Sequence, residues 1–171
     1  MITNEKELEN YIMDNEDSFC SFLCELFDLE DVSILDNQVH VGTSNIIDIM
    51  CAGLTKGSEP KEKIIIVELK FHAIEAKDFS QLGRYMSAIS VVLEEDDENI
   101  YGVLVGTGVS QDCGCILNGE LLNDRIKVVA CASKLEYVNC SDIWWRNCVN
   151  TDGSISSCIL ERTNKGIKNE K

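Results

Sequence analysis

Glu68 and Lys70 are the residues best suited to chemistry, because two charges interrupt an otherwise apolar segment. Residues 64–70 read IIIVELK, and the leading aliphatic residues predict a β-strand with both faces covered. Side chains on a strand alternate between faces, so Glu68 and Lys70 point the same way. A carboxylate and an ammonium are costly to bury unless they pair or bind a ligand. We therefore take this pair as the chemical centre.

Asp48 is the second candidate, because it is the one charged residue in the predicted strand 46–50. A buried strand seldom carries an aspartate without a purpose such as metal ligation or a strong hydrogen bond. Residues 53–63 are polar and rich in turn-forming types, which predicts a hairpin between this strand and the next. Adjacent antiparallel strands would then bring Asp48 close to Glu68 and Lys70.

A long helix is predicted over residues 79–93, with Asp78 or Ser80 as its N-cap. Gln81 and Tyr85 are four residues apart on it, so their side chains project together. The spacing of its apolar residues predicts a stripe facing the core, made of Phe79, Leu82, Met86, Ile89 and Leu93.

Further elements follow from periodicity and turn signals. Helices are predicted over 5–13 and 18–27, and a short one within 109–122. Strands are predicted over 32–35 and 39–42 around an Asp36-Asn37 turn, and over 100–105 and 126–131. Residues 141–149 fit a helix or a strand. We expect one domain over 1–161 and a polar, basic, flexible tail over 162–171.

Composition places the chain in the cytoplasm and argues against a membrane protein. No apolar run is long enough to span a bilayer, and the N-terminus lacks a signal-peptide core. The nine cysteines include no CxxC pair, so we expect free thiols. The net charge of −15 argues against a protein that binds nucleic acid through a strongly basic surface. The acidic run Glu94–Glu98 is predicted to be a solvated loop, or alternatively a docking surface for a basic partner.

The order of these motifs resembles the PD-(D/E)XK nuclease superfamily, and within it RecB-type and NucS-like catalytic domains. The resemblance rests on Asn45–Met50, Ile66–Lys70 and Gln81–Tyr85, and it covers about residues 5–107. It implies an α/β fold of the restriction-endonuclease-like kind, with a central mixed β-sheet flanked by helices. The proline that names the superfamily is missing, because Ile47 stands before Asp48.

A divalent cation is the cofactor that this motif set implies. Magnesium favours oxygen ligands and keeps several waters, so Asp48 and Glu68 are enough to hold Mg²⁺ or Mn²⁺. The resemblance adds the backbone carbonyl of Leu69 as a metal ligand. It also implies an acid on the first helix, for which Glu5 fits best and Glu9 is the alternative.

The resemblance implies a metal-dependent nuclease of defence or repair, acting on DNA rather than RNA. Lys70 would orient the attacking water and stabilise the transition state. Gln81, supported by Tyr85, would help place a water or a phosphate. The alternative is an acidic regulatory protein of the same fold that binds a basic partner without cleaving. A homodimer is a further expectation of the nuclease interpretation.

Overall fold

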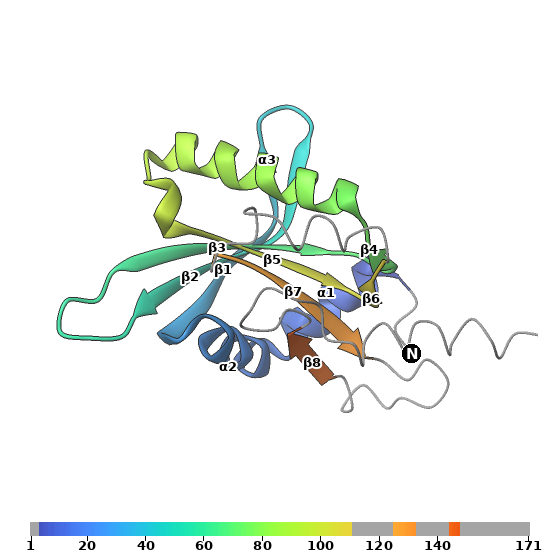
Figure 1. Ribbon diagram of the computed structural model, residues 1–171, viewed down its shortest axis with the longest axis horizontal. Coiled ribbons are helices and arrows are strands. Elements are labelled where there is room, and N and C mark those ends of the chain that lie inside the picture. Colours follow the sequence, from blue (N-terminus) through green and yellow to red (C-terminus); the bar gives the residue numbers. More distant parts are fainter. Residues whose placement is uncertain (1–3, 111–124, 133–143, 148–171) are drawn as a thin grey trace, which may run out of the picture.

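The computed structural model describes residues 4–110, 125–132 and 144–147, which form a mixed β-sheet with helices on both faces (Figure 1). The helices within these ranges are α1 (Glu5–Asp14), α2 (Glu16–Phe27), α3 (Ala76–Leu93) and the short 3-10 helix η1 (Asp97–Asn99). The strands are β1 (Leu29–Val41), β2 (Asn45–Thr55), β3 (Glu62–Leu69), β4 (Ala73–Ile74), β5 (Ile100–Gly106), β6 (Gly108–Val109), β7 (Ile126–Ala132) and β8 (Trp144–Asn147).

The main sheet has six strands in the order β1-β2-β3-β5-β7-β8. Hairpins make β1, β2 and β3 antiparallel neighbours, whereas α3 carries the chain over to β5, which is parallel to β3. β7 continues the parallel part, and β8 pairs with it antiparallel. A separate two-stranded sheet joins β4 and β6. β3 therefore lies in the interior of the sheet, as its apolar sequence predicts.

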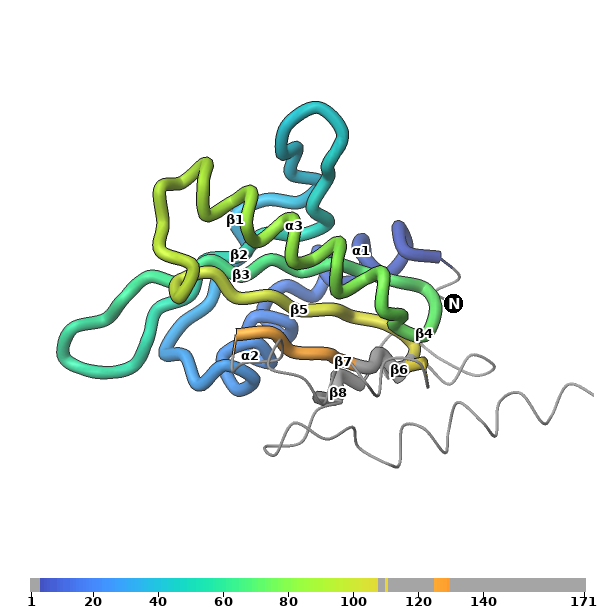
Figure 2. The backbone as a smooth tube through the Cα atoms, turned by 45° about the horizontal axis from the view of Figure 1, so that its top comes forward, coloured from blue at the N-terminus to red at the C-terminus, as the bar shows by residue number. Residues whose placement is uncertain are grey.

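Two hydrophobic cores cover the two faces of the sheet. Ile64 and Ile66 of β3 pack in the core beneath α3, whereas Ile65 and Val67 pack in the core that includes residues of α1 and α2. This alternation is the pleat of a strand buried on both faces. Figure 2 shows α3 lying across one side of the sheet, with α1 and α2 on the other. Even-numbered residues of β3, including Glu68, thus belong to the α3 side.

β1 differs from the sequence prediction, which placed a turn at Asp36-Asn37. The chain instead forms a single strand that pairs with β2 throughout, with a register shift between Ile34 and Asp36. The irregularity is absorbed inside the strand, because pairing resumes directly after it, at Asp36 with Met50. The hairpin turn comes later, where Gly42 has a φ of 69°.

α3 begins three residues before the helix predicted over 79–93 and ends at Leu93, as predicted. It begins at Ala76 because Glu75 is its N-cap and forms a capping box with Asp78, whose Oδ2 accepts the Glu75 N–H at 2.8 Å. Asp78 thus takes part in the cap from the third helical position. Leu93 was predicted in the core but is 43% exposed, because the last turn of α3 lies outside the core and exposes Val91 and Val92 as well.

Further details of the fold concern a helix cap, the cysteines and the region of β8. Asn4 caps α1 by accepting the Glu7 N–H, and the thiols of Cys20, Cys24 and Cys51 are free. Within the range 141–149, where a helix or a strand was predicted, the described residues 144–147 form a strand. The predicted helix within 109–122, the domain limit at 161 and the tail over 162–171 lie outside the described residues. Within the described part, no helix is long and apolar enough to cross a membrane.

Gly106→Ala should destabilise the fold. A Cβ at Gly106 would lie 2.8 Å from the His72 carbonyl oxygen and 2.7 Å from Ile74 Cδ1, so backbone and side chain would both have to move. We expect a loss of about 1–3 kcal/mol in the free energy of unfolding, measured by urea denaturation. Gly83→Ala is the control, because a Cβ there meets nothing within 4 Å and alanine favours a helix interior by up to about 1 kcal/mol. Equal stability of the two variants would contradict this account.

Candidate active site

The predicted Glu68–Lys70 pair forms at the C-terminal end of β3. Glu68 is 2% exposed, and its Oε1 lies 2.8 Å from Lys70 Nζ. Lys70 follows the last residue of the strand, and its backbone N–H donates to the Val105 carbonyl of neighbouring β5 at 2.7 Å. Lys70 is therefore held twice, by the backbone hydrogen bond to Val105 and by the ion pair with Glu68.

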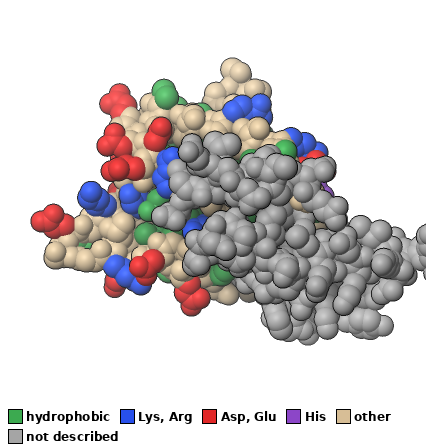
Figure 3. Space-filling model, in the orientation of Figure 1, with side chains coloured by type: hydrophobic (Ala, Val, Ile, Leu, Met, Phe, Trp, Pro, Cys, Tyr) green, Lys and Arg blue, Asp and Glu red, His purple; other side chains and the backbone are tan. Residues whose placement is uncertain are grey.

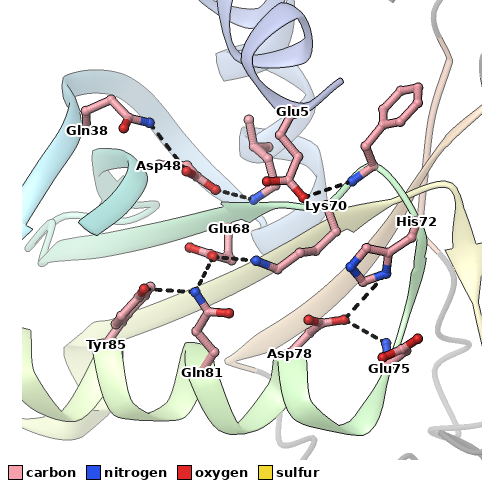
Figure 4. Close-up of polar contacts among 12 residues, drawn as sticks. Glu5, Gln38, Asp48, Glu68, Lys70, His72, Glu75, Asp78, Gln81 and Tyr85 are labelled. Carbon is pink, nitrogen blue, oxygen red and sulfur yellow. Dashed lines mark hydrogen bonds and ion pairs between the residues drawn. The ribbon is translucent and has the colours of Figure 1, made fainter. Parts of the chain in front are cut away.

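α3 contributes the two polar side chains that its helical spacing placed on one face. Gln81 Nε2 donates to Glu68 Oε1 at 2.7 Å and to the Tyr85 hydroxyl at 2.8 Å. Figure 4 shows Gln81 between the other two side chains, pointing from the helix toward the end of β3. Glu68 Oε1 thus accepts from both Lys70 and Gln81, and the carboxylate is held in one orientation.

Asp48 reaches this cluster from β2. The register pairs Ile49 with Val67, which sets Asp48 beside the end of β3. Asp48 Oδ2 accepts the backbone N–H of Leu69 at 2.8 Å, and Oδ1 lies 3.4 Å from Gln38 Nε2. The predicted hairpin between β2 and β3 is therefore confirmed, and it brings Asp48 close to the Glu68–Lys70 segment.

The two acids predicted as alternatives on the first helix occupy different surroundings. Glu5 is exposed and accepts the backbone N–H of Phe71 at 3.3 Å, which places it beside Lys70 (Figure 4). Glu9 is 2% exposed and lies behind Asp48, where its Oε2 accepts from Gln38 Nε2 at 2.8 Å. Glu5 is therefore the acid on the Lys70 side, whereas Glu9 is already bonded to other side chains.

Comparisons with known proteins support the fold of this chain. Neither a family model nor a curated protein matches the sequence. Among solved structures, an EndoMS–dsDNA2 complex is 20% identical over 78% of this chain and 48% of its own, with a TM-score of 0.50. A repair endonuclease from Pyrococcus abyssi is 23% identical over 70% of this chain and 45% of its own, with a TM-score of 0.47. EndoMS in its apo form is 22% identical over 68% and 43%, with a TM-score of 0.40.

The chain has the restriction-endonuclease-like fold. The likeness to the EndoMS–dsDNA2 complex, together with the mixed sheet and its flanking helices, bears out the predicted fold class. The chain spans about half the length of the solved structures that it matches. At this level of identity the likeness establishes the fold, and the site must be argued from its own geometry.

Within this restriction-endonuclease-like fold, the site has more negative than positive charge. Burial, together with the nearby Asp48 carboxylate, raises the pKa of Glu68 to about 7. Burial also raises the pKa of Asp48 above its usual value. Burial alone would lower the pKa of Lys70, but the carboxylates of Glu68, Glu5 and Asp48 outweigh it, and the pKa is raised. The carboxylates of Glu68, Asp48 and Glu5 thus surround the Lys70 ammonium, and the pKa shifts of Glu68, Asp48 and Lys70 all favour the retention of a proton.

One atom of the cluster is suited to a further cation. Glu68 Oε2 is buried and has no hydrogen-bond partner in the described part of the chain, although Oε1 of the same group has two. A buried oxygen without a donor is costly unless something binds it. No group of three or more His, Cys, Asp or Glu side chains within the described residues is arranged to hold a metal alone. Two carboxylates completed by water suit Mg²⁺, which keeps part of its hydration shell.

Gln38 is the site residue that sequence reasoning missed. Its side chain contacts Asp48, yet glutamine in a strand gives no periodic signal, and Gln38 lies between the predicted Asp36-Asn37 turn and the strand predicted from Val39. The available signal was the break in apolar alternation between Leu35 and Val39. Such a break is typical of a turn, but it is equally typical of an irregular strand.

Proposed function

We propose that this chain is a metal-dependent nuclease that hydrolyses phosphodiester bonds in DNA. The observation that carries the proposal is Glu68, a buried carboxylate with one oxygen held by Lys70 and Gln81 and the other without a partner in the described chain. A lysine beside an open carboxylate oxygen combines a group that can bind a cation with a group that can handle an attacking water. The matching EndoMS structure is a complex with dsDNA, which supports DNA as the substrate.

Asp48 and Glu68 would hold Mg²⁺ or Mn²⁺, with the Leu69 carbonyl as a third ligand and Glu5 completing the set. The bound ion would supply positive charge to the scissile phosphate. The attacking water would be handled by a side chain of the protein. Lys70 Nζ, fixed by Glu68 at 2.8 Å, orients the attacking water and stabilises negative charge on the phosphate.

Gln81 and Tyr85 keep Glu68 in its working orientation. The Gln81 amide is itself held by the Tyr85 hydroxyl, so its other N–H stays directed at Glu68 Oε1. Because Oε1 is occupied in this way, Oε2 remains the oxygen that is open to a cation. Gln81 and Tyr85 would therefore contribute to cleavage by orienting Glu68. They would also help to place the attacking water.

The acidic surface motivates the alternative, a regulatory protein that binds a basic partner without cleaving. Residues 94–98 are all exposed, and Figure 3 shows acidic side chains gathered at the C-terminal end of α3. That end lies away from Gln81, which is in the first half of the helix, and from Tyr85, which is near its middle. A protein acting only by charge has no use for a buried lysine among carboxylates, so we favour the nuclease. A basic partner would offset the repulsion between the net charge of −15 and a nucleic acid.

The test is a cleavage assay with wild type and Glu68→Ala on single- and double-stranded DNA and RNA. Each substrate is incubated with Mg²⁺, Mn²⁺ or EDTA. We expect metal-dependent cleavage of DNA by the wild type and none by the variant, with circular dichroism showing that both are folded. Cleavage in EDTA, or equal cleavage by both proteins, would contradict the proposed centre. Absence of cleavage on every substrate by folded wild type would favour the regulatory protein, and salt-sensitive binding to a basic partner would then identify it.

A further inference from the structure

Gln38 has a backbone conformation that residues with a side chain seldom adopt. Its φ is 52°, in the left-handed region, although it lies inside strand β1. The flanking pairs are Asn37 with Ile49 and Val39 with Ile47, so Gln38 stands opposite Asp48 of β2. A strained residue within a paired strand is retained when its side chain makes contacts that a relaxed backbone would not allow.

The side chain of Gln38 joins two carboxylates that come from different elements. Its amide nitrogen lies 2.8 Å from Glu9 Oε2 on α1 and 3.4 Å from Asp48 Oδ1 on β2. A glutamine amide has two N–H donors, so it offers one to each carboxylate without adding charge. Figure 4 shows Gln38 directed at Asp48 from the side opposite Lys70.

Glu9 gives Gln38 a fixed anchor. It is 2% exposed, and its Oε1 accepts from Lys6 Nζ at 2.8 Å and from Asn37 Nδ2 at 2.5 Å. With Gln38 on Oε2, both oxygens of this buried carboxylate are bonded. The anchor therefore has little freedom to move, and it limits the rotation of the Gln38 amide.

Gln38 and Leu69 together engage both oxygens of Asp48. The Leu69 N–H holds Oδ2 at 2.8 Å from the β3 side, and Gln38 approaches Oδ1 from the β1 side. We propose that Gln38 is a positioning residue, anchored by Glu9, that sets the orientation of the Asp48 carboxylate and thereby the affinity of the site for a divalent cation. This inference rests on the proposed function, because it takes Asp48 to be a cation ligand. Groups that orient a ligand from behind contribute about 10–100-fold to metal affinity.

Gln38→Gly separates this role from a structural one. Glycine adopts a φ of 52° without strain, so the variant loses the amide but keeps the backbone. We expect the dissociation constant for Mn²⁺, measured by calorimetry on the full chain, to rise about 10–100-fold. The melting temperature without metal should change little, because relief of the strained backbone offsets the loss of the hydrogen bond to Glu9 Oε2. Gln38→Asn is the second variant, because asparagine tolerates the left-handed region but is too short to reach both carboxylates, and we expect a similar loss of affinity.

Two controls isolate the effect. Glu94 has a φ of 54° at the C-cap of α3, so Glu94→Gly relieves the same kind of backbone strain far from Asp48 and should leave Mn²⁺ affinity unchanged. Asp48→Ala tests the site itself. If Asp48→Ala binds Mn²⁺ as tightly as wild type, the proposed metal site is wrong. If Asp48→Ala loses affinity while Gln38→Gly and Gln38→Asn keep it, the site stands and the positioning role of Gln38 is overturned.

Discussion

Lys70→Met should abolish phosphodiester cleavage while leaving cation binding intact. Lys70 places its ammonium against Glu68, its side chain is 11% exposed, and methionine keeps most of its volume. Loss of the group that handles the attacking water lowers the rate by about 10²–10⁴-fold. Cation affinity should be equal or higher, because Glu68, Asp48 and Glu5 would lose the positive charge that they share. Single-turnover cleavage and Mn²⁺ calorimetry on the same preparation measure both effects.

Lys63→Met is the matched control for Lys70→Met. Lys63 is also buried, but it lies at the start of β3, where its Nζ donates to the Glu98 carbonyl at 3.1 Å and to Asn99 Oδ1 at 2.8 Å. Its replacement leaves those acceptors without their donor, so stability should fall while the cleavage rate per folded molecule stays the same. If Lys70→Met cleaves at the wild-type rate, or if both variants lose cleavage equally, the assigned role of Lys70 is wrong.

The metal-free protein should lose stability as the pH rises from about 4.5 to about 7, the interval between the ordinary and the folded pKa of Glu68. In that interval the folded state binds a proton that the unfolded state releases, so the free energy of unfolding falls with pH. The rise of the Glu68 pKa from 4.5 to about 7 corresponds to a loss of at most about 3 kcal/mol in the free energy of unfolding. Saturating Mg²⁺ should reverse this trend, because the ion competes with the proton and stabilises the folded protein more at pH 8 than at pH 5.

Glu68→Gln reveals the part of this pH dependence that belongs to Glu68. The variant cannot ionise at this position, so its stability should change less between pH 4.5 and 7, and Mg²⁺ should raise its melting temperature less at pH 8. Denaturant unfolding of both proteins, with and without Mg²⁺, gives the four profiles. Superimposable profiles for wild type and Glu68→Gln would show that Glu68 ionises like an exposed carboxylate.

The hairpin and the long helix show how much of the site local patterns could predict. The apolar run 64–67 predicts a strand buried on both faces, and the pleat then puts Glu68 and Lys70 on one side. The spacing of Gln81 and Tyr85 predicts that one helical face presents both, and the structure joins them by a hydrogen bond of 2.8 Å. These features depend on periodicities of two and four residues, which a sequence displays directly.

The ends of elements were predicted less well, because competing local signals had similar strength. Asp36-Asn37 is a favoured turn pair, but extended pairing of β1 with β2 absorbs it as an irregularity. Asp78 is a favoured N-cap, but its carboxylate serves the backbone N–H of Glu75 and the helix begins three residues earlier than the predicted one. In each case a backbone hydrogen-bonding requirement decided between two plausible positions.

The sequence by itself predicted most of the residues of the candidate site, whereas the tertiary structure decided how they are oriented and added Gln38. The register between β2 and β3 sets Asp48 on the Leu69 N–H, and the packing of α1 places Glu5 beside Lys70 and Glu9 behind Asp48. Gln38 reaches Asp48 because its backbone is in the left-handed region, a conformation that no residue pattern in the sequence predicts. These contacts join residues far apart in the chain, so they depend on sheet register and helix packing, which have no local signature in the sequence.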